Sequence, residues 1–594
     1  MGLSEADVER IVRRHLAELL RRYVPAIAGA IAFALVIAFV PTVKHPGGNA
    51  AAGNTVEAGP NANGAAPGAS ETAGDQAALS GTGAPAATAS GGGAAAAKSG
   101  PAAGQRTAST SGPAAATPAG GSGSAPQSAG VAVSGVTCGR DVRQVTWSKY
   151  APWCRPAFSG NNGGNTAQGV TGTTITLAYR KSQSDQGAQF TATVGNDAVP
   201  ADSLIIADMQ TYIDYFNKQF ELYGRKVVLK PFQGQGDPIA ETEGQNPQGA
   251  QADAATAKEM GAFADMSSPL GAETQMYAEA LASNKVLSFG TQLLSQDWYQ
   301  RQAPYAYEWQ PTGDALAEFN ANEVCQRMAG QPAVFAGDAV YKKTTRVFGL
   351  LVPDTPDTKK TGDLLEAKLA ACNVKLAKRI DYSVNLATMQ SQATSSIAQM
   401  RAAGVTTVLC SCDPLSPIFL TSAADQQGYN PEWDAQWWTD NLARNYSQTQ
   451  WAHAITNSGT FPDIKKTEAY TTYKLANPSG EPAEKSYVNV YWNLMTMYLG
   501  LQGAGPNLTP QTFQQGFGST PDSASGADFG PWSFGSNQFS PRHHFQIGWW
   551  NPSAVSKYDG GTGAYQDCNG GTYYKYNDPK SFAPANTQLQ CFGS

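Results

Sequence analysis

Histidine is the side chain best suited to acid–base or metal chemistry near neutral pH, and this sequence has five. His15 and His45 precede the part predicted to fold, which leaves His453 and the adjacent pair His543–His544. Neighbours on a strand point to opposite faces, so this pair cannot chelate one ion without distortion. The chain also lacks a Gly-x-Ser-x-Gly elbow, a His-Glu-x-x-His motif, a phosphate-binding Gly-x-x-x-x-Gly-Lys-Ser/Thr loop, and a Gly-x-Gly-x-x-Gly after a strand. The sequence therefore predicts no enzyme, no cofactor and no metal site.

Cysteine is the second reactive residue type, and all eight cysteines lie at or beyond residue 138. An even number of cysteines in an exported region is typical of disulfides. A zinc site is the alternative, but no Cys-x-x-Cys and no nearby His supports it. Sequence proximity and helix ends favour three pairs: Cys138–Cys154, Cys325–Cys372 and Cys568–Cys591. Cys410 and Cys412 are separated by a single Ser, and their pairing stays open.

Composition divides the chain into two parts. All 12 Trp lie at or beyond Trp147, and no aromatic residue lies between Phe39 and Trp147. A stretch that cannot bury aromatic or branched apolar surface cannot offset the entropy lost on folding, so 44–136 is predicted to be a disordered linker rich in Ala, Gly, Ser and Pro. The net charge of -6, without a basic cluster beyond residue 22, disfavours nucleic-acid binding.

The N-terminal part predicts a membrane anchor. Val24 to Val43 is a run of twenty residues without a charge, long enough to span a bilayer as a helix. Five Arg precede it, so the positive-inside rule places residues 1–23, an amphipathic segment, in the cytoplasm. A cleaved signal peptide is the alternative, but the run is long for one and no clear Ala-x-Ala cleavage site follows it. We expect a single-pass cell-membrane protein with an extracytoplasmic ectodomain.

After a disulfide-containing lead-in, 137–171, strands and helices alternate over 172–552. The predicted strands are 175–179, 226–231, 286–289, 347–352, 375–379, 406–410 and 433–438. The predicted helices are 203–220, 252–264, 272–283, 314–328, 361–371, 388–403 and 415–427. Such alternation predicts an α/β fold of two lobes, each a parallel sheet flanked by helices. In open α/β sheets, ligands bind beyond the carboxyl ends of the strands.

Three segments carry a resemblance to a known family. Tyr223-Gly224-Arg225-Lys226-Val227 follows a strand and a helix; Tyr487 to Gly503 forms a late apolar helix; and Gly530-Pro531 precedes a predicted β-hairpin over Phe539 to Trp550. In this order they resemble the type I periplasmic solute-binding proteins, the leucine/isoleucine/valine-binding family. The resemblance covers 172–552 and implies the same two-lobed fold.

The resemblance implies two contact loops in the first lobe for a ligand carboxylate. Ser267 and Ser268 fit the first loop, after a strand and before a helix, where a hydroxyl and free N–H groups form an anion site. Ser288, Gly290 and Thr291 fit the second loop. An ordinary helix N-cap would use the same residue types as Ser267 and Ser268 and is the alternative.

For the second lobe, the resemblance implies an acid facing the ligand's ammonium, and Asp440 falls at that position. A solvated turn is the alternative role for Asp440. The family's aromatic position is instead occupied by Cys410-Ser411-Cys412-Asp413, from which we take Asp413 as a candidate contact. An insertion at 236–250 lengthens a first-lobe loop. Both departures weigh against a branched-chain amino acid as ligand.

The resemblance implies a membrane-tethered solute-binding protein that captures a small polar, amino-acid-like solute in an interlobe cleft, with an ABC permease or a sensor as partner. The alternative is a surface protein that uses the same fold to bind cell-wall polymer or a protein partner. The last segment, 553–594, is expected to be a disulfide-stapled extension packed on a lobe, and its aromatic residues are an alternative surface for glycan or protein.

Overall fold

The computed structural model describes residues 129–181, 201–267, 274–291 and 293–592, apart from gaps at 437–438, 458–461, 484, 486, 524–527, 536–537 and 586. These residues belong to one unit, Gly112–Ser594. The predicted cytoplasmic segment and the apolar run Val24–Val43 lie outside the described residues. Within the part that is described, no helix has both the length and the apolar character to cross a bilayer.

The lead-in forms a small disulfide-bonded module. Strand β1 (Gly130–Val131) pairs antiparallel with β2 (Thr137–Cys138), and the predicted Cys138–Cys154 disulfide is confirmed. Folded structure therefore begins about seven residues inside the segment that composition assigns to the linker. A two-residue strand has too few side chains to show a periodic pattern, so composition alone could not reveal it.

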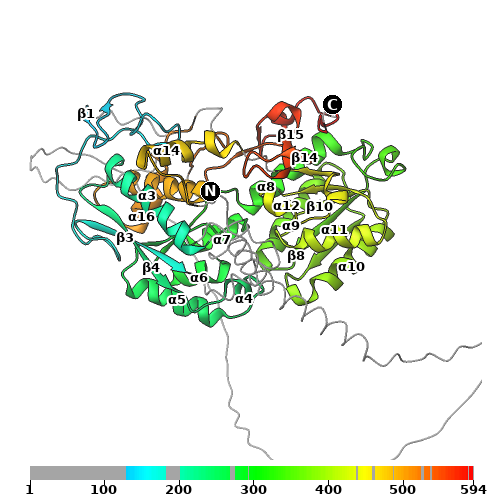
Figure 1. Ribbon diagram of the computed structural model, residues 1–594, viewed down its shortest axis with the longest axis horizontal. Helices are drawn as coiled ribbons and strands as arrows, with labels where there is room; N and C mark the ends of the chain where they lie inside the picture. Colours follow the sequence, from blue (N-terminus) through cyan, green and yellow to red (C-terminus); the bar gives the residue numbers. More distant parts are fainter. Residues whose placement is uncertain are drawn as a thin grey trace, which may run out of the picture. The chain divides into compact units, whose positions relative to one another are not determined.

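The first lobe contains a five-stranded parallel sheet in the order β4-β3-β5-β6-β7. Its strands are β3 (Thr174–Lys181), β4 (Lys226–Gln233), β5 (Ala264–Asp265), β6 (Leu287–Phe289) and β7 (Ala306–Tyr307). Its helices in this part of the chain are α3 (Asp202–Gln219), α4 (Pro238–Thr242), α5 (Pro247–Glu259), α6 (Gln275–Ser283) and α7 (Gln296–Gln302). Helices α5 and α6 pack against each other beside this sheet (Figure 1).

The second lobe contains a seven-stranded sheet in the order β15-β14-β12-β11-β10-β8-β9, parallel from β12 to β9. Its strands are β8 (Phe348–Pro353), β9 (Lys378–Tyr382), β10 (Thr407–Cys410), β11 (Glu432–Ala435), β12 (Ala454–Thr456), β14 (Gly548–Val555) and β15 (Thr562–Asp567). Its helices are α8 (Gly313–Glu323), α9 (Pro356–Ala371), α10 (Leu386–Ala402), α11 (Ser416–Gln426), α12 (Asp440–Ala443) and α13 (Gln448–Trp451). Helices α10 and α11 lie side by side (Figure 1).

The chain passes between the lobes three times: after β7, after β12 and after α16. Helices α14 (Glu468–Ala476), α15 (Tyr487–Ala504) and α16 (Pro510–Phe517) return to the first lobe. Helix α15 is buried almost throughout, as its lack of a polar face predicts. It approaches α16 so closely that a Cβ on Gly503 would lie 2.3 Å from the carbonyl oxygen of Gly516, which explains the glycine there.

The predicted alternation is confirmed, but some helices begin earlier than their apolar pattern indicates. Helix α9 starts at Pro356 instead of 361, and α5 starts at Pro247 instead of 252. In each case the preceding residue, Thr355 or Asn246, accepts a backbone N–H of the first turn, and proline occupies the first helical position. Polar first turns of this kind leave no apolar periodicity to detect.

The C-terminal strands differ most from the prediction. Instead of a hairpin confined to 539–550, β14 pairs antiparallel with β15, whose residues come from the predicted extension 553–594. That extension therefore supplies the edge strand of the second-lobe sheet. A separate short pair joins β13 (His544–Phe545) to β16 (Tyr574–Lys575). The Cys568–Cys591 disulfide forms as predicted.

Two further disulfides lie in the second lobe. Cys325–Cys372 joins the π-helical turn Val324–Met328, which continues α8, to the end of α9, as predicted. Cys410 and Cys412, whose pairing the sequence leaves open, are bonded to each other at the end of β10.

Candidate functional site

The carboxyl ends of the two sheets face each other, and Asp357 marks the contact. Asp357 lies in the first turn of α9, just after β8, and is buried. Its carboxylate accepts hydrogen bonds from Gln275 Nε2 and Ser295 Oγ, both at 3.0 Å, and from Arg301, also at 3.0 Å. These three donors follow the first-lobe strands β5 and β6. Residues beyond the carboxyl ends of both sheets therefore share one space, where the fold is expected to hold a ligand.

The predicted 236–250 insertion forms α4 and the start of α5. Asp237 caps α4 by accepting the N–H groups of Ile239 and Ala240. Glu243, at the end of α4, accepts a hydrogen bond of 2.9 Å from the backbone N–H of Leu386, the first residue of α10. The insertion is therefore an ordered element that bridges the two lobes.

A buried ionic cluster lies beneath this bridge. The Arg180 guanidinium, near the end of β3, contacts Glu241 at 3.0 and 3.1 Å and Asp253 at 3.3 Å. It also lies 3.8 Å from the centroid of the Tyr277 ring. The side chains of Arg180, Glu241 and Asp253 are each at most 1% exposed. The cluster therefore ties α4 and α5 to β3.

Ser267, the first predicted contact, lies just after β5 with its hydroxyl already paired. Ser267 Oγ donates to Asp265 and accepts the backbone N–H of Arg180 at 2.7 Å. Burial raises the pKa of Asp265 to about 6, although the hydrogen bonds from Ser267 and Tyr277 oppose this shift. The Ser267 proton thus points inward in this structure. A direct ligand contact by Ser267 stays a prediction, and Ser268 lies outside the described residues.

The second predicted loop contains a hydroxyl without a partner. Ser288 Oγ, in β6, lies 3.4 Å from the carbonyl oxygen of Tyr305, and Gly290 has a φ of 105°, which favours glycine. Thr291 is 2% exposed, and within the described residues its Oγ1 has no hydrogen-bond partner. Ser288, Gly290 and Thr291 stay predicted contacts. Among them, Thr291 has a buried hydroxyl that a ligand could satisfy.

In the second lobe, Asp440 is the first residue of α12 and is buried, not solvated. Its carboxylate accepts from Ser556 Oγ at 2.7 Å and from the Tyr565 backbone N–H at 3.3 Å. Burial raises the pKa of Asp440 to about 6. Both partners come from the C-terminal strands β14 and β15 and the turn between them. The acid at the family position is therefore held by that hairpin.

Asp413, the other candidate acid, lies just before α11. It accepts the backbone N–H groups of Leu415 and Ser416 at 2.8 and 3.0 Å and the Tyr382 hydroxyl at 2.8 Å. Like Asp440, Asp413 lies beyond a carboxyl end of the sheet and is engaged within the protein. Its role as a ligand contact stays a prediction.

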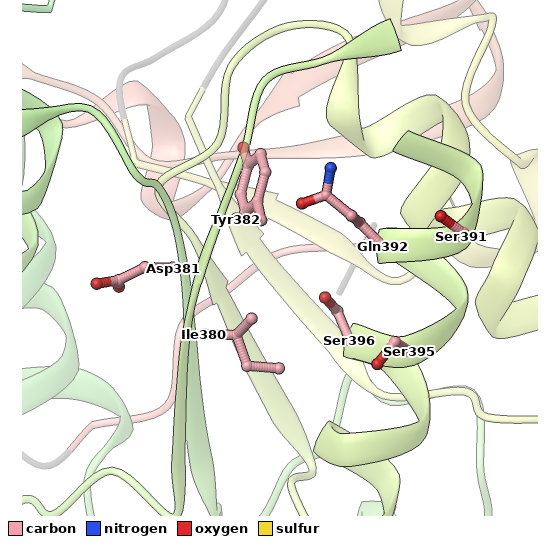
Figure 2. A pocket seen from close by; sticks show the side chains of 7 residues that line it. All are labelled: Ile380, Asp381, Tyr382, Ser391, Gln392, Ser395 and Ser396. Atoms are coloured by element: carbon pink, nitrogen blue, oxygen red, sulfur yellow. The ribbon is translucent and has the colours of Figure 1, made fainter. Parts of the chain in front are cut away.

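Tyr382 also lines a pocket of about 360 Å³ between β9 and α10. Figure 2 shows β9 on one side and the polar side chains of α10 on the other. The lining residues are Ile380, Asp381, Tyr382, Ser391, Gln392, Ser395 and Ser396. All come from the second lobe, so this pocket does not combine contacts from both lobes.

Sequence reasoning missed a row of polar residues at the carboxyl ends of β10, β11 and β12. Ser411, Gln436 and Asn457 each directly follow one of these strands. Gln436 Nε2 donates to Ser411 Oγ at 3.4 Å. Within the described residues, neither Gln436 Oε1 nor Asn457 Oδ1 has a hydrogen-bond partner. The only sequence signal for the row is that each residue directly follows a strand. Residues that follow adjacent parallel strands lie at the same edge of the sheet.

A second buried acidic group lies within the second lobe, below this row. Asp434, in β11, accepts a 2.7 Å hydrogen bond from Asn320 Nδ2, and neighbouring Glu432 pairs with Arg346 at 2.7 and 3.0 Å. Burial, reinforced by the charge of Glu432, raises the pKa of Asp434 to about 7. Asp434 is therefore protonated in the folded protein well above the pH at which it ionises when unfolded.

This shift predicts a pH dependence that Asp434→Asn removes. The folded pKa lies above the unfolded value of about 3.9, so the stabilisation is complete below that value and is lost as pH rises through about 7. Between pH 5 and 8.5, we expect wild type to lose about 2–3 kcal/mol of unfolding free energy relative to Asp434→Asn. Urea unfolding at both pH values measures this, with exposed Asp363→Asn as control. A difference between wild type and Asp434→Asn that is constant with pH would contradict the prediction.

A family comparison agrees with this geometry. The family model described as "Periplasmic binding protein" matches residues 194–556. A leucine-, isoleucine-, valine-, threonine- and alanine-binding protein from Brucella ovis is 14% identical, with a TM-score of 0.48 over 70% of this chain and 98% of that one. A 4-hydroxybenzoate-bound solute-binding protein from R. palustris is 11% identical, with a TM-score of 0.45 over 66% of this chain and 96% of that one.

An ABC transporter substrate-binding protein from Desulfitobacterium hafniense, complexed with Leu, is 13% identical, with a TM-score of 0.43 over 66% of this chain and 99% of that one. No curated protein sequence matches significantly. The predicted two-lobed α/β fold and the resemblance to the leucine/isoleucine/valine-binding type are confirmed. Because the family match spans more than half of the sequence, the chain belongs to the periplasmic binding protein family.

Proposed function

We propose that this protein is a membrane-tethered extracytoplasmic receptor that captures a small polar solute between the carboxyl edges of its two sheets. One observation carries the proposal: the Asp357 contact brings these edges together, and both edges hold buried polar atoms that have no partner among the described residues. Thr291 supplies such an atom from the first lobe, and Gln436 and Asn457 supply them from the second. Such atoms are costly unless something pairs with them, and a solute would do so.

The cellular setting is part of the same proposal. The uncharged run Val24–Val43 anchors the chain in the cell membrane with its N-terminus in the cytoplasm. Four disulfides within 138–591 support an oxidising location for the ectodomain. Lobe closure around the solute is the signal, and an ABC-type permease or a sensor receives it. The family resemblance favours an amino-acid-like solute.

One observation favours the alternative of a surface interaction protein. Helix α4, which the insertion supplies, already joins the lobes through the contact between Glu243 and Leu386. A receptor that closes without solute would present a constant surface to cell-wall polymer or to a protein partner. Solute-dependent stabilisation distinguishes the two functions, because the alternative needs no small molecule.

The test uses the full chain purified in detergent. Mass spectrometry of the denatured protein identifies any retained solute, and a thermal-shift screen of amino acids and uncharged polar compounds follows. We expect at least one compound to raise the melting temperature by several degrees at saturation. Absence of any retained or stabilising compound would contradict the solute-binding function.

Thr291→Val tests the first-lobe contact. Valine keeps the shape of the side chain but cannot form a hydrogen bond, so we expect about tenfold weaker solute binding in isothermal titration, equivalent to about 1.4 kcal/mol. Thr394→Val is the matched control, because Thr394 is exposed on α10 and its hydroxyl donates to the Gln390 carbonyl of the same helix. Equal affinity for Thr291→Val and wild type would remove Thr291 from the site.

A further inference from the structure

We propose that the second lobe recognises an uncharged hydroxyl- or amide-bearing part of the solute through Ser411, Gln436 and Asn457. This inference rests on the proposed solute-binding function and narrows its ligand class. It replaces the ammonium group, which the resemblance implies at this lobe, with a neutral hydrogen-bonding group.

The register of the sheet places the three residues in one row. Cys410 pairs with Ala435, and Ala435 pairs with Thr456, at the last ladder positions of β10, β11 and β12. The next residues along the three strands are Ser411, Gln436 and Asn457. The Asn457 backbone N–H donates to the Ala435 carbonyl at 3.1 Å, which extends the ladder to this row. Residues of one row share a face, and the contact between Gln436 and Ser411 agrees with this.

Two residues of the row, Gln436 and Asn457, are buried and incompletely paired within the described residues, and Ser411 is half-buried. Gln436 is 9% exposed and Asn457 is 5% exposed. Gln436 Oε1 and Asn457 Oδ1 lack partners among the described residues, so the residues that follow two adjacent strands each leave one acceptor unpaired at the edge that faces the first lobe. A solute with O–H or N–H groups would satisfy both. Neutral amides cannot balance the charge of a desolvated ammonium, so an uncharged group is the better match.

The carboxylates at this edge are already engaged. Asp440 accepts from Ser556 and Tyr565, and Asp413 accepts from the first turn of α11 and from Tyr382. An ammonium that used Asp440 would have to reach a carboxylate that is 3% exposed and that already accepts a hydrogen bond on each of its two oxygens. The carboxylates that could pair with the ammonium of an amino-acid ligand are therefore already hydrogen-bonded within the protein.

The Cys410–Cys412 disulfide positions Ser411 within the row. It links the residues on either side of Ser411, and both cysteines are buried. The link restricts the backbone at Ser411, so its hydroxyl stays next to Gln436. The segment Cys410-Ser411-Cys412 stands where the family resemblance implies an aromatic contact. A small hydroxyl in place of an aromatic ring leaves space for a hydrated or branched polar solute.

The experiment compares two panels on the full chain in detergent: the standard amino acids, and uncharged pentoses, hexoses, inositol and aliphatic amides. We expect an uncharged compound to raise the melting temperature. Gln436→Met and Asn457→Leu should each weaken its binding at least tenfold in isothermal titration. Both variants remove a buried acceptor that has no partner in the part of the chain that the structure describes, so their melting temperatures without solute should match or exceed wild type. The control Gln399→Leu alters an exposed amide on α10.

Three results would overturn the inference, each in a different way. An amino acid that binds, with affinity lost in Asp440→Asn and retained in both row variants, would refute the neutral site and leave the solute-binding function intact. If an uncharged compound binds and neither row variant changes its affinity, its binding site lies elsewhere. If no compound of either panel binds, the proposed function fails together with the inference. If one row variant fails to fold, the other variant still tests the inference, because each residue contributes its own acceptor.

Discussion

Replacing Arg180 with methionine is expected to lower the free energy of unfolding by about 3–5 kcal/mol. Methionine keeps much of the volume but removes the charge that Glu241 and Asp253 share. These carboxylates are at most 1% exposed, so water cannot replace the lost partner. Breaking a buried pair by removing one partner costs more than the net value of the pair, because a buried charge stays behind. Urea unfolding followed by tryptophan fluorescence measures the loss.

The matched control is Arg379→Met. Arg379 pairs with Asp363, Glu366 and Asp381, whose side chains are between 27% and 67% exposed. Exposed ion pairs contribute at most about 1 kcal/mol, so this variant should stay close to wild type. Adding Glu241→Gln to Arg180→Met should recover part of the stability, because one stranded charge disappears. Equal losses for the Arg180 and Arg379 variants would show that the cluster is not the source of the stability.

This cluster illustrates what the sequence could not reveal. Arg180 is 61 positions from Glu241 and 73 from Asp253, and the insertion that contains Glu241 is predicted as a loop. Local patterns report which face of a helix or strand is apolar, but not which distant charges meet in the interior. The short helix α4 depends on such contacts, because five residues are too few to hold a helix by themselves.

Much of the fold follows from local pattern. The long amphipathic helices α3 and α10 and the apolar strands β8 and β10 lie within a few residues of their predicted positions, because each buries one face of regular period. The two-residue strands β1, β5 and β7 have no period to detect. Strand β15 was missed for another reason: Gly560 and Gly563 at its start indicate a turn, while its pairing with β14 is decided by tertiary contacts.

The sequence predicted where the candidate site residues lie, but not which of them are hydrogen-bonded within the protein. Ser267, Thr291 and Asp440 all follow sheet strands, as the family order implies. Whether a side chain is available to a ligand depends on contacts from elsewhere in the chain. Asp265 engages Ser267, and Ser556 engages Asp440, while Thr291 has no described partner. The row at Ser411, Gln436 and Asn457 could be identified only from the register of the sheet. The predicted strand 433–438 also included Gln436, which in the structure follows the end of β11.

Removing the Asp357 carboxylate is expected to open the two lobes. Asp357→Ala deletes three hydrogen bonds from the first lobe, one of them from charged Arg301, and should destabilise the closed arrangement by about 2–4 kcal/mol. Neither core contains Asp357, so each lobe should keep its own stability. Dyes on cysteines introduced at the exposed positions Glu259 and Gln399, one on each lobe, should report a lower transfer efficiency in the variant.

Two comparisons test whether the Asp357 contact is a latch, that is, whether it holds the lobes closed, or is only part of the packing. Asp363→Asn, on an exposed position of the same helix, should leave the transfer efficiency unchanged. Saturating solute should restore the closed value in Asp357→Ala, because binding energy that spans both lobes replaces the lost hydrogen bonds. The solute's dissociation rate should then rise by about tenfold or more, since closure is no longer supported when the site is empty. If Asp357→Ala keeps wild-type transfer efficiency without solute, closure depends on the α4 bridge through Glu243 and Leu386, and Asp357 is not the latch.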